Sequence, residues 1–263
     1  MKIMKHNLFL LIISILLSTC FLSTVFCDMT AEEILKKVVE QGFKESFRAA
    51  LTIKTFKGKK PPTTQTLWVC GKLIGDQSDF FIDFDEPKES RGLRFLLQTR
   101  PEQAPKIFMY LPATQKTIPV VTDDPSSDIG GTGLNTDDIL GFVPNPKEKY
   151  SIAGEEKVGG QDCWIIKFVR PDDKGERLAW VRKQDFTIVK SQDMDSSKKV
   201  NRTYKVIEFF KTEDGREFPR EEEITMPKRN IRILVRQENA VFGVELANAL
   251  FDPKRFGTYK WKD

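Results

Sequence analysis

Apolar residues recur with two different periods along the chain. The first period is helical: between Ala31 and Gly42 apolar residues return every three to four positions, which predicts one amphipathic helix. Thr30 and Glu33 form a capping box at its start, in which each side chain accepts a hydrogen bond from an otherwise free backbone amide. The helix has one apolar face, which we expect to pack against a sheet. Its apolar positions are Ile34, Leu35, Val38 and Val39.

From Ala49 onward the period changes to two, which is typical of strands with one face against a core. Turn pairs such as Gly159-Gly160, Lys174-Gly175 and Asp214-Gly215 separate several runs and predict hairpins. Many short strands with one good helix favour an antiparallel barrel or a strongly curved antiparallel sheet over a parallel α/β fold. The predicted strands are 49–54, 64–71, 80–84, 93–98, 106–111, 117–121, 150–158, 163–169, 177–182, 188–193, 203–210, 220–226 and 231–238.

One segment interrupts the strands. Residues Asp123 to Asn135 are rich in Asp, Ser, Pro and Gly, and residues 136–142 then show a short helical pattern. We expect Thr136 or Asn135 to cap this helix, and acidic residues after the cap suit the positive helix start. Two interpretations stay open: a mobile lid whose apolar side chains cover an opening, or a surface connection that these side chains pin down. They are Ile139, Leu140 and Phe142.

The first 27 residues have the pattern of a cleavable export signal. Lysines stand near the start, residues 8–17 form a ten-residue apolar run, and the small Cys27 fits a cut before Asp28. The run is too short to cross the ~30 Å core of a bilayer as a helix, which needs about 20 residues. We therefore expect a signal peptide at 1–27 and a single exported domain at 28–263.

Two alternatives to this cleavage stay open. The apolar stretch could remain as an uncleaved anchor that extends to Phe26, or Cys20 could receive a lipid anchor. Thr19 is bulky for the position before a lipid-modified cysteine, which favours cleavage after Cys27. In every case the protein leaves the cytoplasm.

Cleavage also removes His6, the one histidine of the sequence. Without an imidazole base the domain cannot build a Ser-His-Asp or Cys-His site, and zinc sites with His ligands are excluded too. Chemistry by paired carboxylates survives this test, and Asp83, Asp85 and Glu86 cluster near a strand end. Acidic turns at strand ends are far commoner than such pairs. We therefore expect a protein that is not an enzyme and that needs no cofactor and no metal.

Only two cysteines remain after cleavage, Cys70 and Cys163, each in a strand-like run. An exported protein meets an oxidising compartment, where a disulfide would persist. A disulfide requires Cα atoms within about 7 Å, and strands so distant in sequence need not be neighbours. We favour two small buried apolar side chains.

Charge and composition narrow the function further. The net charge is +4, and basic and acidic residues alternate rather than forming blocks, so nothing indicates nucleic-acid binding. Aromatic residues make up 11% of the chain and include 20 Phe. This is more apolar bulk than one sheet face requires, and it suggests a lined cavity.

Several blocks of sequence together resemble the outer-membrane lipoprotein-sorting family, the LolA/LolB-like group in its longer variant. They occur in the family's order and span about Ala31 to Phe256. Where relatives often have an aromatic residue in the block before the short helix, this chain has Asn135-Thr136. The blocks are Glu86–Leu93, Phe108–Ala113, Gly131–Ile139, Val158–Trp164, Leu178–Val181 and Leu250–Phe256.

The resemblance implies a mainly β (α+β) fold: a curved antiparallel sheet forming a half-barrel of about ten or eleven strands, with an N-terminal helix and a short lid helix. It also implies a periplasmic carrier or chaperone that binds acyl chains of lipoproteins or lipids in an apolar cavity, for transfer toward the outer membrane. Expected partners are acylated lipoproteins or lipids, an inner-membrane transporter and, transiently, a membrane; we expect a monomer. The alternative is a non-enzymatic lipid-sensing or scaffold module that docks to an envelope transporter or regulator.

Three strands place bulky residues on one face at period two, as a lined cavity requires. Together with the lid side chains they are the candidate lipid-binding residues. For each of them ordinary core is the alternative, because an apolar strand face mostly means core. The strand residues are Leu93, Phe95, Leu97, Phe108, Tyr110, Trp164, Ile166 and Phe168.

Overall fold

The computed structural model describes residues 29–41, 45–74, 77–100, 103, 105–120, 128–140, 148–169 and 175–261. The expected signal peptide, Cys20 and Phe142 lie outside these residues. The helices are α2 (Ala31–Gln41), α3 (Thr136–Leu140), η2 (Pro227–Arg229) and η3 (Asn248–Phe251). The strands are β1 (Phe47–Lys57), β2 (Thr63–Ile74), β3 (Gln77–Glu86), β4 (Arg94–Thr99), β5 (Lys106–Leu111), β6 (Lys116–Val120), β7 (Lys149–Val158), β8 (Gln161–Val169), β9 (Glu176–Arg182), β10 (Ile188–Met194), β11 (Val200–Lys211), β12 (Glu217–Met226) and β13 (Ile231–Phe242).

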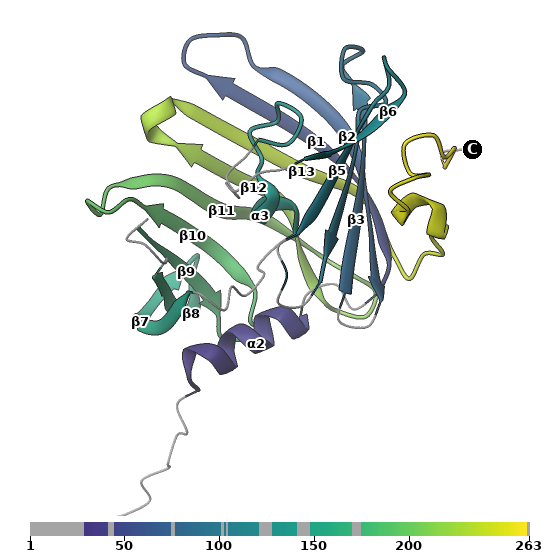
Figure 1. Cartoon of the computed structure of the whole chain (residues 1–263). Helices are drawn as coiled ribbons and strands as arrows, with labels where there is room; N and C mark the ends of the chain where they lie inside the picture. Colours follow the sequence, from purple (N-terminus) through teal and green to yellow (C-terminus); the bar gives the residue numbers. More distant parts are fainter. Residues whose placement is uncertain are drawn as a thin grey trace, which may run out of the picture.

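All thirteen strands belong to one open antiparallel sheet, in the order β6-β5-β4-β3-β2-β1-β13-β12-β11-β10-β9-β8-β7. Pairing of β1 with β13 joins the two halves, and the sheet bends so that these halves flank α3 (Figure 1). The prediction of a mainly β antiparallel fold is confirmed. The count of about ten or eleven strands is too low, because that number came from the family resemblance; the thirteen stretches predicted from apolar alternation correspond to the thirteen strands.

Helix α2 forms as its sequence predicts. The backbone amide of Glu33 donates to Thr30 Oγ1 at 3.2 Å, and the amide of Thr30 donates to Glu33 Oε2 at 2.8 Å, so the capping box is confirmed. Ile34 and Leu35 are buried. They pack against apolar side chains of β8 and β9, so the helix covers the sheet near the edge formed by β7 (Figure 1).

The two faces of the sheet carry separate cores. We call the face that holds α3 the inner face, and the apolar cluster on it the inner cluster. The outer face is covered over β3 to β5 by the C-terminal segment 243–261 (Figure 1). The buried members of the inner cluster are Phe47, Ile53, Leu67, Val69, Phe80, Ile82, Phe84, Phe95, Leu97, Ile107, Ile129, Leu134, Ile224, Met226, Ile231, Ile233 and Val235.

The C-terminal segment is held by a partly buried arginine. Arg94 Nη1 donates to the backbone carbonyls of Phe256, Gly257 and Tyr259 at 3.1, 2.8 and 2.9 Å. Trp261 Nε1 donates to Asp83 Oδ2 at 2.7 Å. The Asp83 carboxylate, one of the candidate acidic residues, therefore serves the attachment of this segment.

Both cysteines are free and buried. Cys70 packs on the outer face with the C-terminal segment, whereas Cys163 packs with Trp180 and Val189 in another cluster. The interpretation of two small buried apolar side chains is confirmed.

Candidate functional site

The inner cluster is covered by residues 128–140, which we call the cover segment. Ile129 and Leu134 are buried within the cluster, and Ile139 of α3 packs against it. In the described part of this segment, these three apolar side chains hold it against the sheet. The chain reaches the sheet closely at Gly130, where an added Cβ would lie 2.4 Å from the ring of Phe84.

Polar contacts also hold the cover segment on the sheet. Thr55 Oγ1 donates to the carbonyl of Thr132 at 3.1 Å, and Gln65 Nε2 donates to the carbonyl of Gly130 at 3.2 Å. Both bonds join neutral groups, and such bonds contribute only about 0.5–1.5 kcal/mol each. These two hydrogen bonds therefore hold the cover segment on the sheet only weakly.

Helix α3 begins with a reciprocal cap. The amide of Asp138 donates to Asn135 Oδ1 at 3.0 Å, and the amide of Asn135 donates to Asp138 Oδ2 at 2.7 Å. Of the two expected caps, Asn135 is the one used. Asn135 and Thr136 are both buried, so the pair that departs from the family pattern packs inside the protein.

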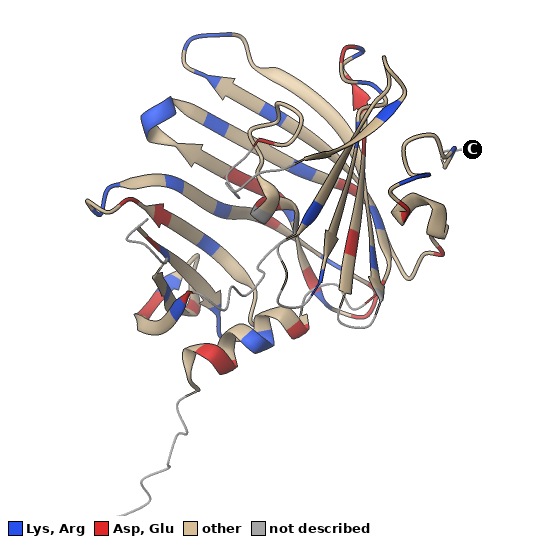
Figure 2. Cartoon of the chain, viewed as in Figure 1, with Lys and Arg blue, Asp and Glu red and all other residues tan. Residues whose placement is uncertain are grey.

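A row of charged side chains crosses the inner face below α3. Arg202 of β11 forms an ion pair with Asp138 of α3. In the sheet Arg202 lies opposite Asp193 of β10, and Asp193 lies opposite Arg177 of β9 and pairs with it at 2.8 Å. Charges of both signs are visible along these strands in Figure 2. At the far end of the row, Arg177 lies opposite Phe168 of β8, which belongs to the cluster under α2.

A second polar pair borders the inner cluster. Tyr204 Oη donates to Glu222 Oε1 at 2.5 Å. Burial raises the pKa of Glu222 to about 7; the hydrogen bond from Tyr204 opposes this rise and the nearby Asp138 adds to it. Tyr204 lies opposite Ile224, which belongs to the inner cluster. The inner face thus combines an apolar area with a polar border.

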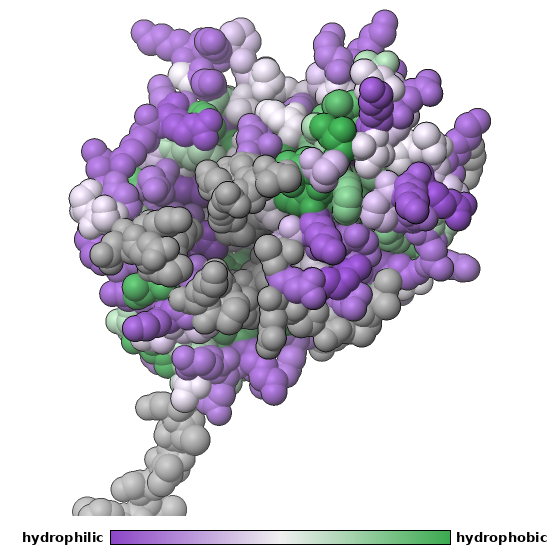
Figure 3. Space-filling view, in the orientation of Figure 1, coloured by the Kyte–Doolittle hydropathy of each residue, from purple (hydrophilic) through white to green (hydrophobic). Residues whose placement is uncertain are grey.

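The candidate residues Leu93, which precedes β4, and Phe95 and Leu97 of β4 lie on the inner face. Phe95 and Leu97 are buried in the inner cluster, and Leu93 packs at its border. Apolar atoms gather near β5 beside the cover segment, whereas hydrophilic residues dominate the rest of the view in Figure 3. Ile139 joins this group, the side chain of Leu140 is not described, and Phe142 lies outside the described residues.

Phe108 and Tyr110 lie on the other side of the sheet. Leu97 is opposite Ile107 and Phe95 is opposite Met109, so the inner residues of β5 have odd numbers. Sequence reasoning missed Ile107 and Met109 because β5 is apolar on both faces, and only its register with β4 distinguishes them.

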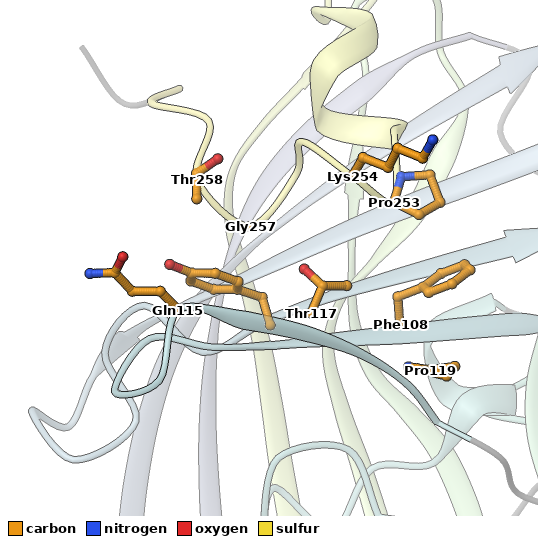
Figure 4. Close-up of a pocket in the computed structure, with 9 residues that line it drawn as sticks. Phe108, Gln115, Thr117, Pro119, Pro253, Lys254, Gly257 and Thr258 are labelled. Atoms are coloured by element: carbon orange, nitrogen blue, oxygen red, sulfur yellow. The ribbon is translucent and has the colours of Figure 1, made fainter.

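Phe108 and Tyr110 instead line an outer groove of about 470 Å³. Phe108 and Thr117 point from the strands toward Pro253 and Lys254 of the C-terminal segment (Figure 4). Tyr110 packs with the buried side chains below this segment. The two aromatic residues therefore belong to a separate site. The other lining residues are Gln115, Pro119, Gly257 and Thr258.

The candidate residues of β8 lie on the inner side, but α2 covers them. Ile166 and Phe168 are almost completely buried against the helix. Trp164 is partly buried and stacks on Phe186, with ring centroids 5.7 Å apart. For this strand the alternative of ordinary core under the N-terminal helix describes the packing.

Comparisons with known proteins agree with this architecture. A family model described as "Uncharacterized protein" matches residues 76–258. Among curated proteins, no match to this chain was found. Several solved structures are similar over most of its length.

A putative outer-membrane lipoprotein-sorting protein domain from Vibrio parahaemolyticus has a TM-score of 0.77 at 16% identity, over 86% of this chain and 97% of that one. A DUF1329 family protein from Desulfovibrio piger has a TM-score of 0.72 at 19% identity, over 84% and 97% of the two chains. A LolA superfamily protein from Nitrosomonas europaea has a TM-score of 0.66 at 18% identity, over 85% and 98%. The chain therefore belongs to the family of uncharacterized proteins that the model describes, and it has the fold of the LolA-like lipoprotein-sorting proteins.

Proposed function

We propose that this chain is a carrier that binds the acyl chains of lipoproteins or lipids on its inner face. The observation that carries the proposal is the covering of the inner cluster by a loop and one short helix instead of a second layer. An apolar surface under a small cover becomes accessible when that cover moves away. In this proposal the chain performs no chemical step.

The energetics suit loading and release. Burying an acyl chain is worth roughly 0.8 kcal/mol per methylene. Part of this gain is lost, because the ligand takes the place of Ile129, Leu134 and Ile139 on the inner cluster. Exchange of apolar side chains for an apolar ligand keeps the affinity moderate, and it closes the surface again after release.

The proposed setting is the periplasm, with transfer toward the outer membrane. The similarity to a putative lipoprotein-sorting domain and the signal-like N-terminus support it. None of the helices in the described part of the chain has the length and apolar composition needed to span a bilayer. Proposed partners are acylated lipoproteins or lipids, an inner-membrane transporter and, transiently, a membrane surface.

Neighbouring residues of β5 provide a matched test. Met109 packs against the inner cluster, whereas Phe108 packs against the apolar cluster under the C-terminal segment, which we call the outer cluster. Both residues are partly buried. The buried members of the outer cluster are Cys70, Phe81, Leu96, Tyr110, Leu250, Phe251 and Phe256. We would replace each in turn by Trp and titrate the protein with a brominated fatty acid, which quenches tryptophan fluorescence on contact. We expect saturable additional quenching in Met109→Trp and none in Phe108→Trp.

Two results would contradict the proposal. One is the absence of saturable binding in the folded wild-type protein and in both variants. The other is stronger quenching at Phe108→Trp, which would move the ligand to the outer groove. A stable complex with an envelope protein that forms without any acyl ligand would favour a scaffold module instead.

A further inference from the structure

The charged row on the inner face connects the sheet with the cover segment. Its four members alternate in sign: Asp138, Arg202, Asp193 and Arg177. Three of them belong to the sheet, and the fourth, Asp138, comes from the cover segment. The cover segment therefore supplies the carboxylate that pairs with Arg202 of the sheet.

The pair between Arg202 and Asp138 is largely shielded from water, since their side chains are only 13% and 12% exposed. A guanidinium stays charged at physiological pH. Removing one partner of a shielded pair leaves the other uncompensated, and this is costly. If an uncharged ligand displaced the cover segment, the Arg202 guanidinium would lose the Asp138 carboxylate that pairs with it.

The pair also lies at the edge of the apolar area. Tyr204, which follows Arg202 by two residues on the same face of β11, packs against the inner cluster. Ile139, which follows Asp138 in α3, packs against the same cluster. A ligand with an acyl chain on the inner cluster can therefore place a head group where the Asp138 carboxylate now lies.

We propose that the inner face recognises acyl amphiphiles with an anionic head group, a carboxylate or a phosphate, whose anion replaces Asp138 on Arg202. This inference rests on the proposed function and names its ligand class. Asp138 then acts as an internal substitute for the head group. A neutral amphiphile opens the same cover without this compensation and binds less tightly.

The test compares two probes that differ only in head-group charge: dansyl-aminoundecanoic acid and its uncharged primary amide. Wild-type protein should bind the acid about tenfold more tightly than the amide, as for one hydrogen-bonded charge pair. Asp138→Asn should raise affinity for the acid several-fold more than for the amide, because Arg202 is no longer neutralised by the cover. Arg202→Gln should reduce the ratio to about one while the amide still binds.

The controls separate charge recognition from stability. Asp79 is a buried carboxylate on the outer face, paired with Arg100 at 2.6 Å, so Asp79→Asn should leave the ratio unchanged. Arg202→Lys should restore part of the preference, and this variant answers the question if Arg202→Gln does not fold.

The outcomes are distinct. Equal binding of both probes, with no change in Arg202→Gln, overturns this inference but leaves the carrier proposal standing. Binding of neither probe defeats the carrier proposal itself. Inorganic phosphate at millimolar concentration should compete only weakly with the acid. Complete displacement by phosphate, with amide binding intact, would identify a site for free anions and overturn the assignment to amphiphiles.

Discussion

Leu96 and Leu97 are neighbours on β4, both completely buried, and they face opposite sides of the sheet. Leu97 belongs to the inner cluster, under the cover segment. Leu96 belongs to the outer cluster, under the C-terminal segment. Because the two side chains are identical and equally buried, substituting each in turn distinguishes the contributions of the two faces.

We expect Leu96→Ala and Leu97→Ala to destabilise the protein similarly, by about 2–5 kcal/mol each, through the lost packing and the cavity left behind. Only Leu97→Ala should change the affinity for an acyl probe, because only this cavity opens onto the proposed binding surface. Urea denaturation and probe titration measure the two effects. Equal changes of probe affinity in both variants would count against an inner binding face.

Two adjacent glycines test the cover segment. Gly130 and Gly131 both have positive φ, at 64° and 77°, so alanine strains either position by roughly 1–2 kcal/mol. A Cβ at Gly130 would meet the buried Phe84 ring, whereas a Cβ at Gly131 meets nothing within 4 Å. Gly130→Ala should therefore loosen the cover by about 1–3 kcal/mol more than Gly131→Ala.

The measurement for this pair is hydrogen exchange of the Ile129 amide, which donates to the carbonyl of Leu134 at 2.8 Å. Gly130→Ala should accelerate this exchange and also raise the affinity for an acyl probe, since the cover competes with the ligand. Faster exchange without tighter probe binding would show that the cover does not compete with the ligand.

Local signals in the sequence carried most of the secondary structure. The alternation of apolar residues predicted every strand within a few residues, and Thr30 with Glu33 predicted the start of α2. These features depend on neighbours in the chain. The side of the sheet to which each side chain points depends instead on strand pairing. Phe108 and Met109 are both apolar, and only the pairing with β4 decides which one reaches the inner cluster.

The polar part of the candidate site was beyond sequence reasoning for the same reason. Arg202 and Asp138 are 64 residues apart, and each stands in a stretch of ordinary mixed charge. Tyr204 and Glu222 meet through the register of β11 and β12. Ile129 and Leu134 were visible as the apolar residues of a polar segment, but their burial depends on the sheet below them.

The attachment of the C-terminal segment should be separable from ligand binding. Replacing Arg94 by Met keeps much of the side-chain volume and removes the donor that serves three carbonyls of this segment. We expect residues 252–261 to become sensitive to limited proteolysis, with probe affinity within twofold of wild type by the additivity expected of separate sites. Arg91→Met, which removes an exposed partner of Glu86, is the control and should leave proteolysis unchanged.

Glu222 should make stability depend on pH near neutrality. Burial raises its pKa in the folded protein from 4.5 to about 7, so between these values the folded state binds more protons than the unfolded state. Stability from this group is fully present below about pH 4.5 and is lost as pH rises through about 7, with a total change of roughly 3 kcal/mol. Glu222→Gln should remove this decrease.

Urea denaturation at a series of pH values between 5 and 8 measures the effect. Glu223→Gln is the matched control, because Glu223 is the next residue of β12 and forms an ion pair with Arg232. That variant should retain the decrease in stability with rising pH. If Glu222→Gln and wild type lost stability in parallel, another group would be responsible, and Glu222 would be ionised in the folded protein throughout this range.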